Sequence, residues 1–182
     1  MALTYTPTGE LGSKLPEFKL PDVQGKEHQN SDIEGSAAKL VVFICAHCPY
    51  VLAIEDRLIE LGKKLEELNV PMLAICSNDS TDYPEDRPEA LKQRAEEKGY
   101  TFPYLLDESQ SVAKDFGAVC TPDFFVYDNA NVLAYRGRMD DSWKDASKVS
   151  QEELLNAVQM ILKENNAPEN QHPSLGCSIK WK

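Results

Sequence analysis

The fold predicted for this 182-residue chain depends on residues 39–50, with the sequence KLVVFICAHCPY. The run Leu40–Ile44 is apolar throughout, which is typical of a strand that is buried on both faces inside a helix-covered sheet. From about Cys48 to Leu68 the apolar residues recur three and four positions apart, and this spacing predicts an amphipathic helix. The segment Cys45–Cys48 therefore lies where a buried strand gives way to the N-terminus of a helix.

The two cysteines of this segment form a Cys-x-x-Cys pair. Backbone N–H groups and the helix dipole favour a thiolate at a helix N-terminus. We therefore expect Cys45 to be the more exposed and more acidic thiol that attacks a disulfide, and Cys48 to resolve the mixed disulfide. One alternative is an inert pair in the core. Another is a zinc knuckle, but His28 and His172 lack the spacing to complete it, so we predict a redox pair and no metal.

His47 lies between the two cysteines in the sequence. An imidazolium near Cys45 would stabilise its thiolate, and a stabilised reduced form makes a redox couple more oxidising. The alternative is a solvated histidine with no effect on the thiols. We include His47 among the candidate catalytic residues.

Composition excludes several classes of function. The formal net charge is −11, and an acidic surface repels nucleic acid and anionic membranes. No stretch approaches the roughly 20 apolar residues of a membrane span. The first ten residues lack the basic start and apolar run of a signal peptide, so we expect a cytoplasmic protein. There, the five cysteines are expected to be catalytic or metal-binding rather than structural.

The remaining pattern predicts an α/β protein. A second apolar run at residues 70–77 makes a strand, and strand, helix and strand form a parallel βαβ unit. We expect one domain over residues 1–182, with an extended arm at 1–17 and a tail at 165–182. Asp86 is expected to cap a helix that ends at Gly99, and Ser150-x-x-Glu153 is a capping box. The other expected elements are hairpins at 18–28 and 119–137, a strand at 102–106 and a helix at 109–116.

These motifs resemble a known superfamily. The Cys-Ala-His-Cys sequence with its helix, together with residues 119–125 (VCTPDFF), resembles the thioredoxin-like superfamily. The N-terminal extension and the polar segment after residue 76 resemble its redoxin (AhpC/TSA) branch. More narrowly, CAHCPY and the ending GCSIKWK are similar to the peroxiredoxin-like thioredoxin-family proteins, which carry the name thiol–disulfide isomerase. The resemblance covers roughly residues 15–182.

The resemblance implies a thioredoxin-like fold, with a central mixed sheet between helices in three layers and an N-terminal β-hairpin extension. It implies a cis Pro122 that faces the Cys-x-x-Cys, and Thr121 as a substrate contact. On sequence alone, a trans Pro122 is the commoner form. The resemblance also places Cys120 near the pair as an auxiliary thiol, and the alternative is that Cys120 packs inertly in the sheet.

The sequence differs from the thioredoxin and peroxiredoxin patterns at several positions. Ile44 stands where thioredoxin has tryptophan, and Lys39 stands where thioredoxin has a buried acid. The peroxiredoxin motif Pro-x-x-x-Thr-x-x-Cys fits neither Cys45 nor Cys48, which weakens a peroxidase role.

The sequence therefore predicts a thiol–disulfide oxidoreductase that needs no cofactor. Its partners would be protein disulfides and a cellular thiol reductant, and the chain would be a monomer or a homodimer. The alternatives are a thiol peroxidase and a redox-inactive binding module. Cys76 is expected in the core, while Cys177 is either a spare redox thiol or idle.

Overall fold

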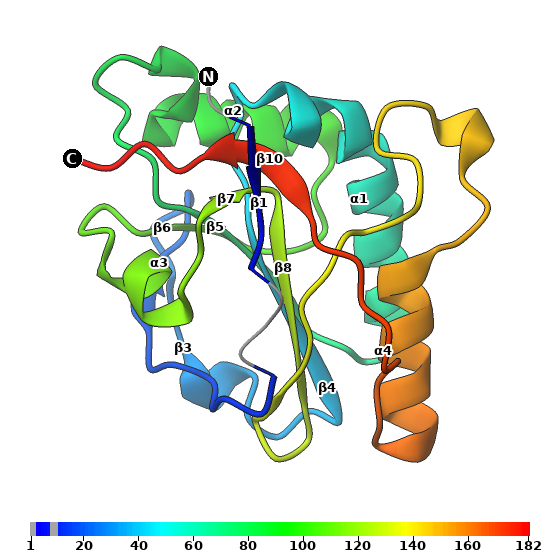
Figure 1. The fold of residues 1–182 in the computed structure, drawn as a ribbon. Helices are drawn as coiled ribbons and strands as arrows, with labels where there is room; N and C mark the ends of the chain where they lie inside the picture. Colours follow the sequence, from blue (N-terminus) through cyan, green and yellow to red (C-terminus); the bar gives the residue numbers. More distant parts are fainter. Residues whose placement is uncertain (1–2, 8–10) are drawn as a thin grey trace.

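The computed structural model describes residues 3–7 and 11–182, and its centre is a five-stranded sheet (Figure 1). The strand order is β6-β5-β4-β8-β9. β4, β5 and β6 are parallel, while β8 and β9 are antiparallel to their neighbours, so the predicted mixed sheet is confirmed. The bounds are β4 Ala38–Phe43, β5 Met72–Cys76, β6 Tyr104–Leu106, β8 Asp123–Asp128 and β9 Leu133–Tyr135.

Both faces of the sheet are covered, because every residue of β4 is buried and successive side chains alternate between the faces. Leu40 and Val42 pack with three helices, whereas Val41 and Phe43 pack with a fourth helix and a hairpin. The first three helices are α1 Pro49–Glu67, α2 Pro88–Lys98 and α4 Glu153–Glu164. The other face carries α3 Ser111–Phe116 and the hairpin of β2 Lys19–Pro21 and β3 Glu27–Gln29. These are the predicted three layers.

The helix after the cysteines begins as its sequence predicts. Cys48 is the extended N-cap residue of α1, and Pro49 occupies the first turn, where its missing N–H costs no hydrogen bond. The parallel pairing of β4 with β5 confirms the βαβ unit around α1.

Two predicted helix caps are wrong. Asp86 does not cap α2, whose N-cap residue is Arg87, although Gly99 ends this helix in the left-handed conformation as expected. Ser150 does not cap α4, because its hydroxyl donates to the Asp141 carboxylate. In both cases a polar side chain that suits a helix end is bonded to a more distant partner instead.

Lys39 lies at the end of β4 that is remote from the cysteines. Its side chain is fully buried, and its ammonium donates to the Asp128 carbonyl at 2.8 Å and to Asn131 in the β8–β9 turn. These partners satisfy a charge that burial would otherwise destabilise, and burial lowers the pKa of Lys39.

The C-terminal segment that the sequence suggests as a tail contains a strand, β10 Leu175–Ser178. β10 pairs antiparallel with β1 Leu3–Tyr5 on one side and with β7 Cys120–Thr121 on the other (Figure 1). Gly176 permits this approach, because a Cβ atom there would lie 1.9 Å from the Thr121 carbonyl oxygen. Among the described residues, no helix combines the length and the apolar character needed to cross a bilayer.

The substitution Gly176→Ala should separate β10 from β7. Because the added methyl group meets backbone rather than a flexible side chain, we expect the free energy of unfolding to fall by about 3 kcal/mol, as measured by denaturant unfolding. Gly35→Ala is the matched control, since nothing lies within 4 Å of its Cβ position and a change within about 0.5 kcal/mol is expected. Equal stability of the two variants would contradict the close approach.

Candidate active site at the Cys-x-x-Cys motif

The cysteine pair lies between the end of β4 and the start of α1, beneath the loop that holds Pro122. All five cysteines of the chain are thiols in the structure. The exposed fraction is 1% for Cys45 and 0% for Cys48, so the expectation of an exposed Cys45 is wrong. A thiol at a helix N-terminus is exposed only where nothing covers it, and here the Thr121–Pro122 loop lies against both sulfurs.

Thr121 contacts both members of the pair. Its Oγ1 lies 3.2 Å from the Cys45 sulfur, and its carbonyl oxygen lies 3.0 Å from the Cys48 sulfur, where it accepts a hydrogen bond when Cys48 is protonated. The peptide bond between Thr121 and Pro122 is cis, so the predicted cis proline beside the pair is confirmed.

The two thiols are joined by a hydrogen bond that separates their acidities. The hydrogen bond from Cys45 lowers the pKa of Cys48 to about 5 against the opposing effect of burial, and the N–H groups of Val51 and Cys177 add to this. The same hydrogen bond raises the pKa of Cys45, together with burial and the negative charge of Asp86. The expected order of acidity is therefore reversed, mainly because Cys48 accepts the hydrogen bond from Cys45, with a smaller effect from the Val51 N–H in the first turn of α1.

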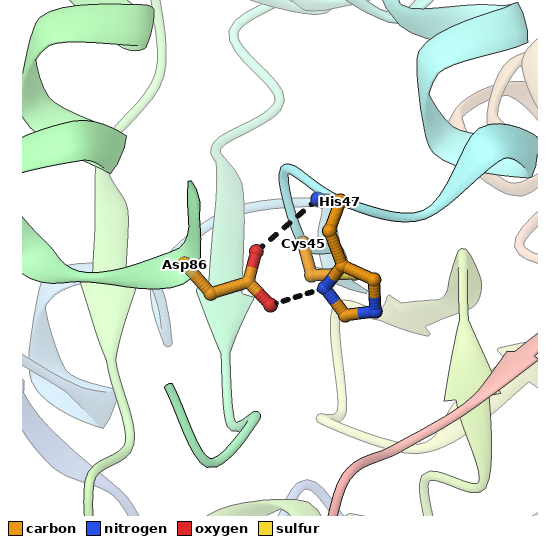
Figure 2. Close-up of side chains that lie close together, drawn as sticks. All are labelled: Cys45, His47 and Asp86. Carbon is orange, nitrogen blue, oxygen red and sulfur yellow. Dashed lines mark hydrogen bonds and ion pairs between the residues drawn. The ribbon is translucent and has the colours of Figure 1, made fainter. Parts of the chain in front are cut away.

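Asp86 organises the loop between the cysteines (Figure 2). Its Oδ1 accepts the N–H of Ala46 at 2.7 Å and the N–H of His47 at 3.3 Å. Its Oδ2 accepts from Nδ1 of His47 at 2.6 Å and from the Asn78 amide at 2.9 Å. Burial by itself would raise the pKa of Asp86, but the hydrogen bonds from His47 and Asn78 outweigh it and lower the pKa. A buried carboxylate thus fixes the backbone of the Cys-x-x-Cys loop.

His47 is not a solvated side chain. Its side chain is 7% exposed, and its ring stacks on Tyr83 with centroids 4.0 Å apart. Nδ1 faces Asp86, and Nε2 is buried with no hydrogen-bond partner among the described residues. Asp86 offsets any positive charge on His47, so the effect of His47 on the Cys45 thiolate stays a prediction.

Cys45, His47 and Asp86 also form a donor set for a metal ion, since one ligand atom from each lies within 4.8 Å of the others. Zinc bonds to nitrogen and oxygen of about 2.0–2.1 Å place tetrahedral ligand atoms roughly 3.3 Å apart. His47 Nδ1 and Asp86 Oδ2 lie 2.6 Å apart in a hydrogen bond. These two atoms would have to separate to share an ion, so the observed geometry is that of a hydrogen-bonded pair.

The other cysteines differ in their relation to the pair. Cys76 is buried in β5 as expected, and burial raises its pKa to about 12. Cys120 is buried, and its thiol lies 3.7 Å from the Pro122 carbonyl oxygen. Cys177 has a side-chain hydrogen bond with Cys48. From the sequence, Asp86 was expected to cap a helix and Cys177 was either a spare redox thiol or idle, and neither was placed beside the pair. The polar segment that follows β5 was the one signal for Asp86.

The AhpC/TSA family model matches residues 11–136 of the sequence. The chain belongs to the AhpC/TSA family. The thiol–disulfide oxidoreductase ResA of Bacillus thuringiensis subsp. konkukian is 26% identical over 121 residues, which cover 65% of this chain and 64% of ResA. The peroxiredoxin Bcp of Escherichia coli K12 is 25% identical over 128 residues, which cover 69% of this chain and 77% of Bcp. The chain thus spans less than two thirds of the ResA proteins it matches.

Solved structures extend the likeness. An uncharacterised conserved protein from Geobacillus kaustophilus has a TM-score of 0.94 and 41% identity, with 100% of this chain and 97% of that chain covered. The thioredoxin domain of a thiol–disulfide oxidoreductase from Bacteroides vulgatus has a TM-score of 0.64 at 17% identity, covering 86% of this chain and all of that domain. The predicted thioredoxin-like fold and its AhpC/TSA branch are therefore confirmed.

Replacing Asp86 with asparagine should destabilise the protein in a pH-dependent way. The variant loses an acceptor for buried donors, so we expect the free energy of unfolding to fall by about 1–3 kcal/mol at pH 7. Because the folded pKa of Asp86 is lowered, its contribution is complete above its unfolded value of about 4 and is lost as the pH falls through the folded pKa. The deficit of the variant should therefore shrink in denaturant titrations below about pH 4. Asp115→Asn, at an exposed carboxylate on α3, is the control, and a deficit of the Asp86 variant that persists in acid would argue against this linkage.

The ionisation of the pair can be followed by the ultraviolet absorbance of thiolates, which needs no reagent to reach the buried sulfurs. The reduced protein should form one thiolate with a pKa near 5, the value that the Cys45 hydrogen bond gives to Cys48. Cys48→Ser should remove this step, and Cys76→Ser should leave it in place. A first step at the ordinary cysteine value of about 8.5 would contradict the lowered pKa.

Proposed function

We propose that this protein is a thiol–disulfide oxidoreductase that acts on protein disulfides through Cys45 and Cys48. The observation that carries the proposal is the hydrogen-bonded thiol pair, with its lowered first pKa, beneath the cis-Pro122 loop. Membership of the AhpC/TSA family supports redox chemistry at cysteine, and ResA is named for this activity.

In the proposed reaction, the Cys48 thiolate takes the proton of the hydrogen-bonded Cys45 thiol as Cys45 attacks one sulfur of the substrate disulfide. The substrate S–S bond breaks, and the leaving sulfur departs as a thiolate that takes up a proton. Cys48 then loses its proton and attacks the Cys45 sulfur, which releases the second substrate sulfur and forms the Cys45–Cys48 disulfide. Two electrons pass to the substrate, and a cellular thiol restores the pair.

We assign attack to Cys45 because the Cys48 sulfur has no exposed surface and contacts the Thr121 carbonyl and Cys177. Protonated His47 would stabilise the attacking thiolate, since one of its ring nitrogens lies within 4.8 Å of the Cys45 sulfur. Asp86 holds the ring in that position.

A groove beside Pro122 supports a polypeptide substrate. It has a volume of about 330 Å³ and is mostly apolar. The rings of Tyr50 and Trp143 lie 4.5 Å apart along it, and Trp143 is 37% exposed. In the proposal, apolar side chains next to a substrate disulfide occupy this groove while Thr121 and Pro122 contact the substrate chain. The groove is also lined by Tyr5, Ile54, Phe124 and Leu175.

Reduction of insulin disulfides by a small dithiol tests the proposal. The wild type should accelerate the reaction, Cys45→Ser should abolish it, and Cys48→Ser should accumulate a mixed disulfide between Cys45 and insulin. Cys76→Ser is the control and should keep wild-type activity.

Peroxide consumption in the same variants separates the rival functions, since Bcp is named a peroxiredoxin. Rapid turnover of hydrogen peroxide by a protein that leaves insulin unchanged would replace the proposal with a peroxidase. If Cys45 and Cys48 never form a disulfide in any glutathione buffer, the protein would instead be a redox-inactive binding module.

A further inference from the structure

The register of β10 against β7 decides which cysteine can join the redox pair. Cys177 pairs directly with Thr121, and Ser178 pairs with Cys120. Side chains of directly paired residues lie on the same face of a sheet, and neighbours along a strand lie on opposite faces. Thr121 presents its hydroxyl to Cys45, so the side chain of Cys177 is on the face toward the pair and that of Cys120 is on the other face.

The contacts agree with this register. The side chain of Cys177 is hydrogen-bonded to the Cys48 sulfur, and its backbone N–H donates to the same sulfur. Cys177 is 2% exposed and packs in one cluster with Cys45 and Cys48. Gly176 brings this strand close enough for the contact, since a larger residue would meet the Thr121 carbonyl. The Cys48 sulfur is therefore hydrogen-bonded to both the Cys45 and the Cys177 side chains.

We propose that Cys177 is a third redox thiol that exchanges with the Cys45–Cys48 disulfide and forms a Cys48–Cys177 disulfide. The inference rests on the proposed redox function of the pair and adds a second disulfide partner for Cys48. A Cys-x-x-Cys pair completes its cycle with two sulfurs, so the reduction cycle itself does not require Cys177.

The exchange is balanced in atoms and electrons. The Cys177 sulfur attacks the Cys48 sulfur, the Cys45–Cys48 bond breaks, and Cys45 leaves as a thiolate that takes up the proton lost by Cys177. No external oxidant or reductant is consumed. Burial and the Cys48 thiolate raise the pKa of Cys177 to about 12 in the reduced protein. The part of this rise that comes from the thiolate disappears once Cys48 is in a disulfide, which favours the attack.

The product of the exchange has a distinct chemistry. Cys45 is again a thiol beneath the Pro122 loop, while Cys48 is held by Cys177 and cannot resolve a mixed disulfide. Cys45 then attacks a substrate disulfide and is displaced by another substrate thiol, with no net electron transfer. This is disulfide isomerisation, whereas the Cys45–Cys48 cycle is reduction.

Native oxidation of the Cys45→Ser variant tests whether the product of the exchange, the Cys48–Cys177 disulfide, can form in the folded protein. Diamide accepts two electrons and two protons from a pair of neighbouring thiols, and peptide mass mapping identifies the product. We expect loss of two hydrogen atoms and a Cys48–Cys177 linked peptide. The linkage should persist in Cys45→Ser/Cys120→Ser and vanish in Cys45→Ser/Cys177→Ser. Cys48 that remains a thiol in the folded Cys45→Ser protein would overturn the proposal, as would a link to Cys120.

A second measurement uses the variant Cys177→Ser, with Cys177→Ala in case serine disturbs the fold. We expect refolding of scrambled ribonuclease to slow several-fold more than insulin reduction does, so that the ratio of isomerase to reductase activity falls. Equal losses of both activities, or no loss of either, would count against a third redox thiol. Failure of the wild type to reduce insulin would remove the proposed function, yet a Cys48–Cys177 link in the diamide experiment would still establish the thiol contact.

Discussion

The contact of Thr121 with both cysteine sulfurs is the constraint on which the site depends. It fixes the end of β7 against the N-terminus of α1, and the cis bond to Pro122 follows immediately. β10 must then lie against the same residue, which only Gly176 allows. One residue thus brings together the pair, the proline loop and the C-terminal strand, and the result is a dithiol with almost no exposed surface.

The carboxylate of Asp86 has two opposing effects on the site around this contact. The buried Asp86 carboxylate accepts four hydrogen bonds from the motif and its neighbours, and these bonds stabilise the loop. Its charge also disfavours a thiolate at Cys45, and negative charge in the pair is therefore held at Cys48, where N–H groups point. Cys45 and Cys48 thus share one proton. The positions of Asp86 and of the N–H groups, rather than exposure to solvent, favour that proton on Cys45.

The sequence predicted the strands, helices and helix ends that are determined by residues close together along the chain. The apolar run before Cys45, the helical spacing after Cys48 and the left-handed end at Gly99 are local signals, and the structure agrees with each. Asp86 was taken for a helix cap because a carboxylate suits a helix start, whereas its true partners are Ala46 and His47, about 40 positions away. Strand register is equally non-local, so the sequence could not distinguish Cys120 from Cys177.

The pairing of β10 with β1 has a consequence for the order of folding. Leu3 lies opposite Cys177, so this ladder joins segments that are separated by nearly the whole sequence. Contacts of such long range carry a greater loop-closure cost than local contacts and slow folding. The βαβ unit that contains Cys45 and Cys48 is built from nearer contacts and can form earlier. The shielding of the dithiol therefore depends on pairing between the first and last strands, whereas the unit that carries the two cysteines does not.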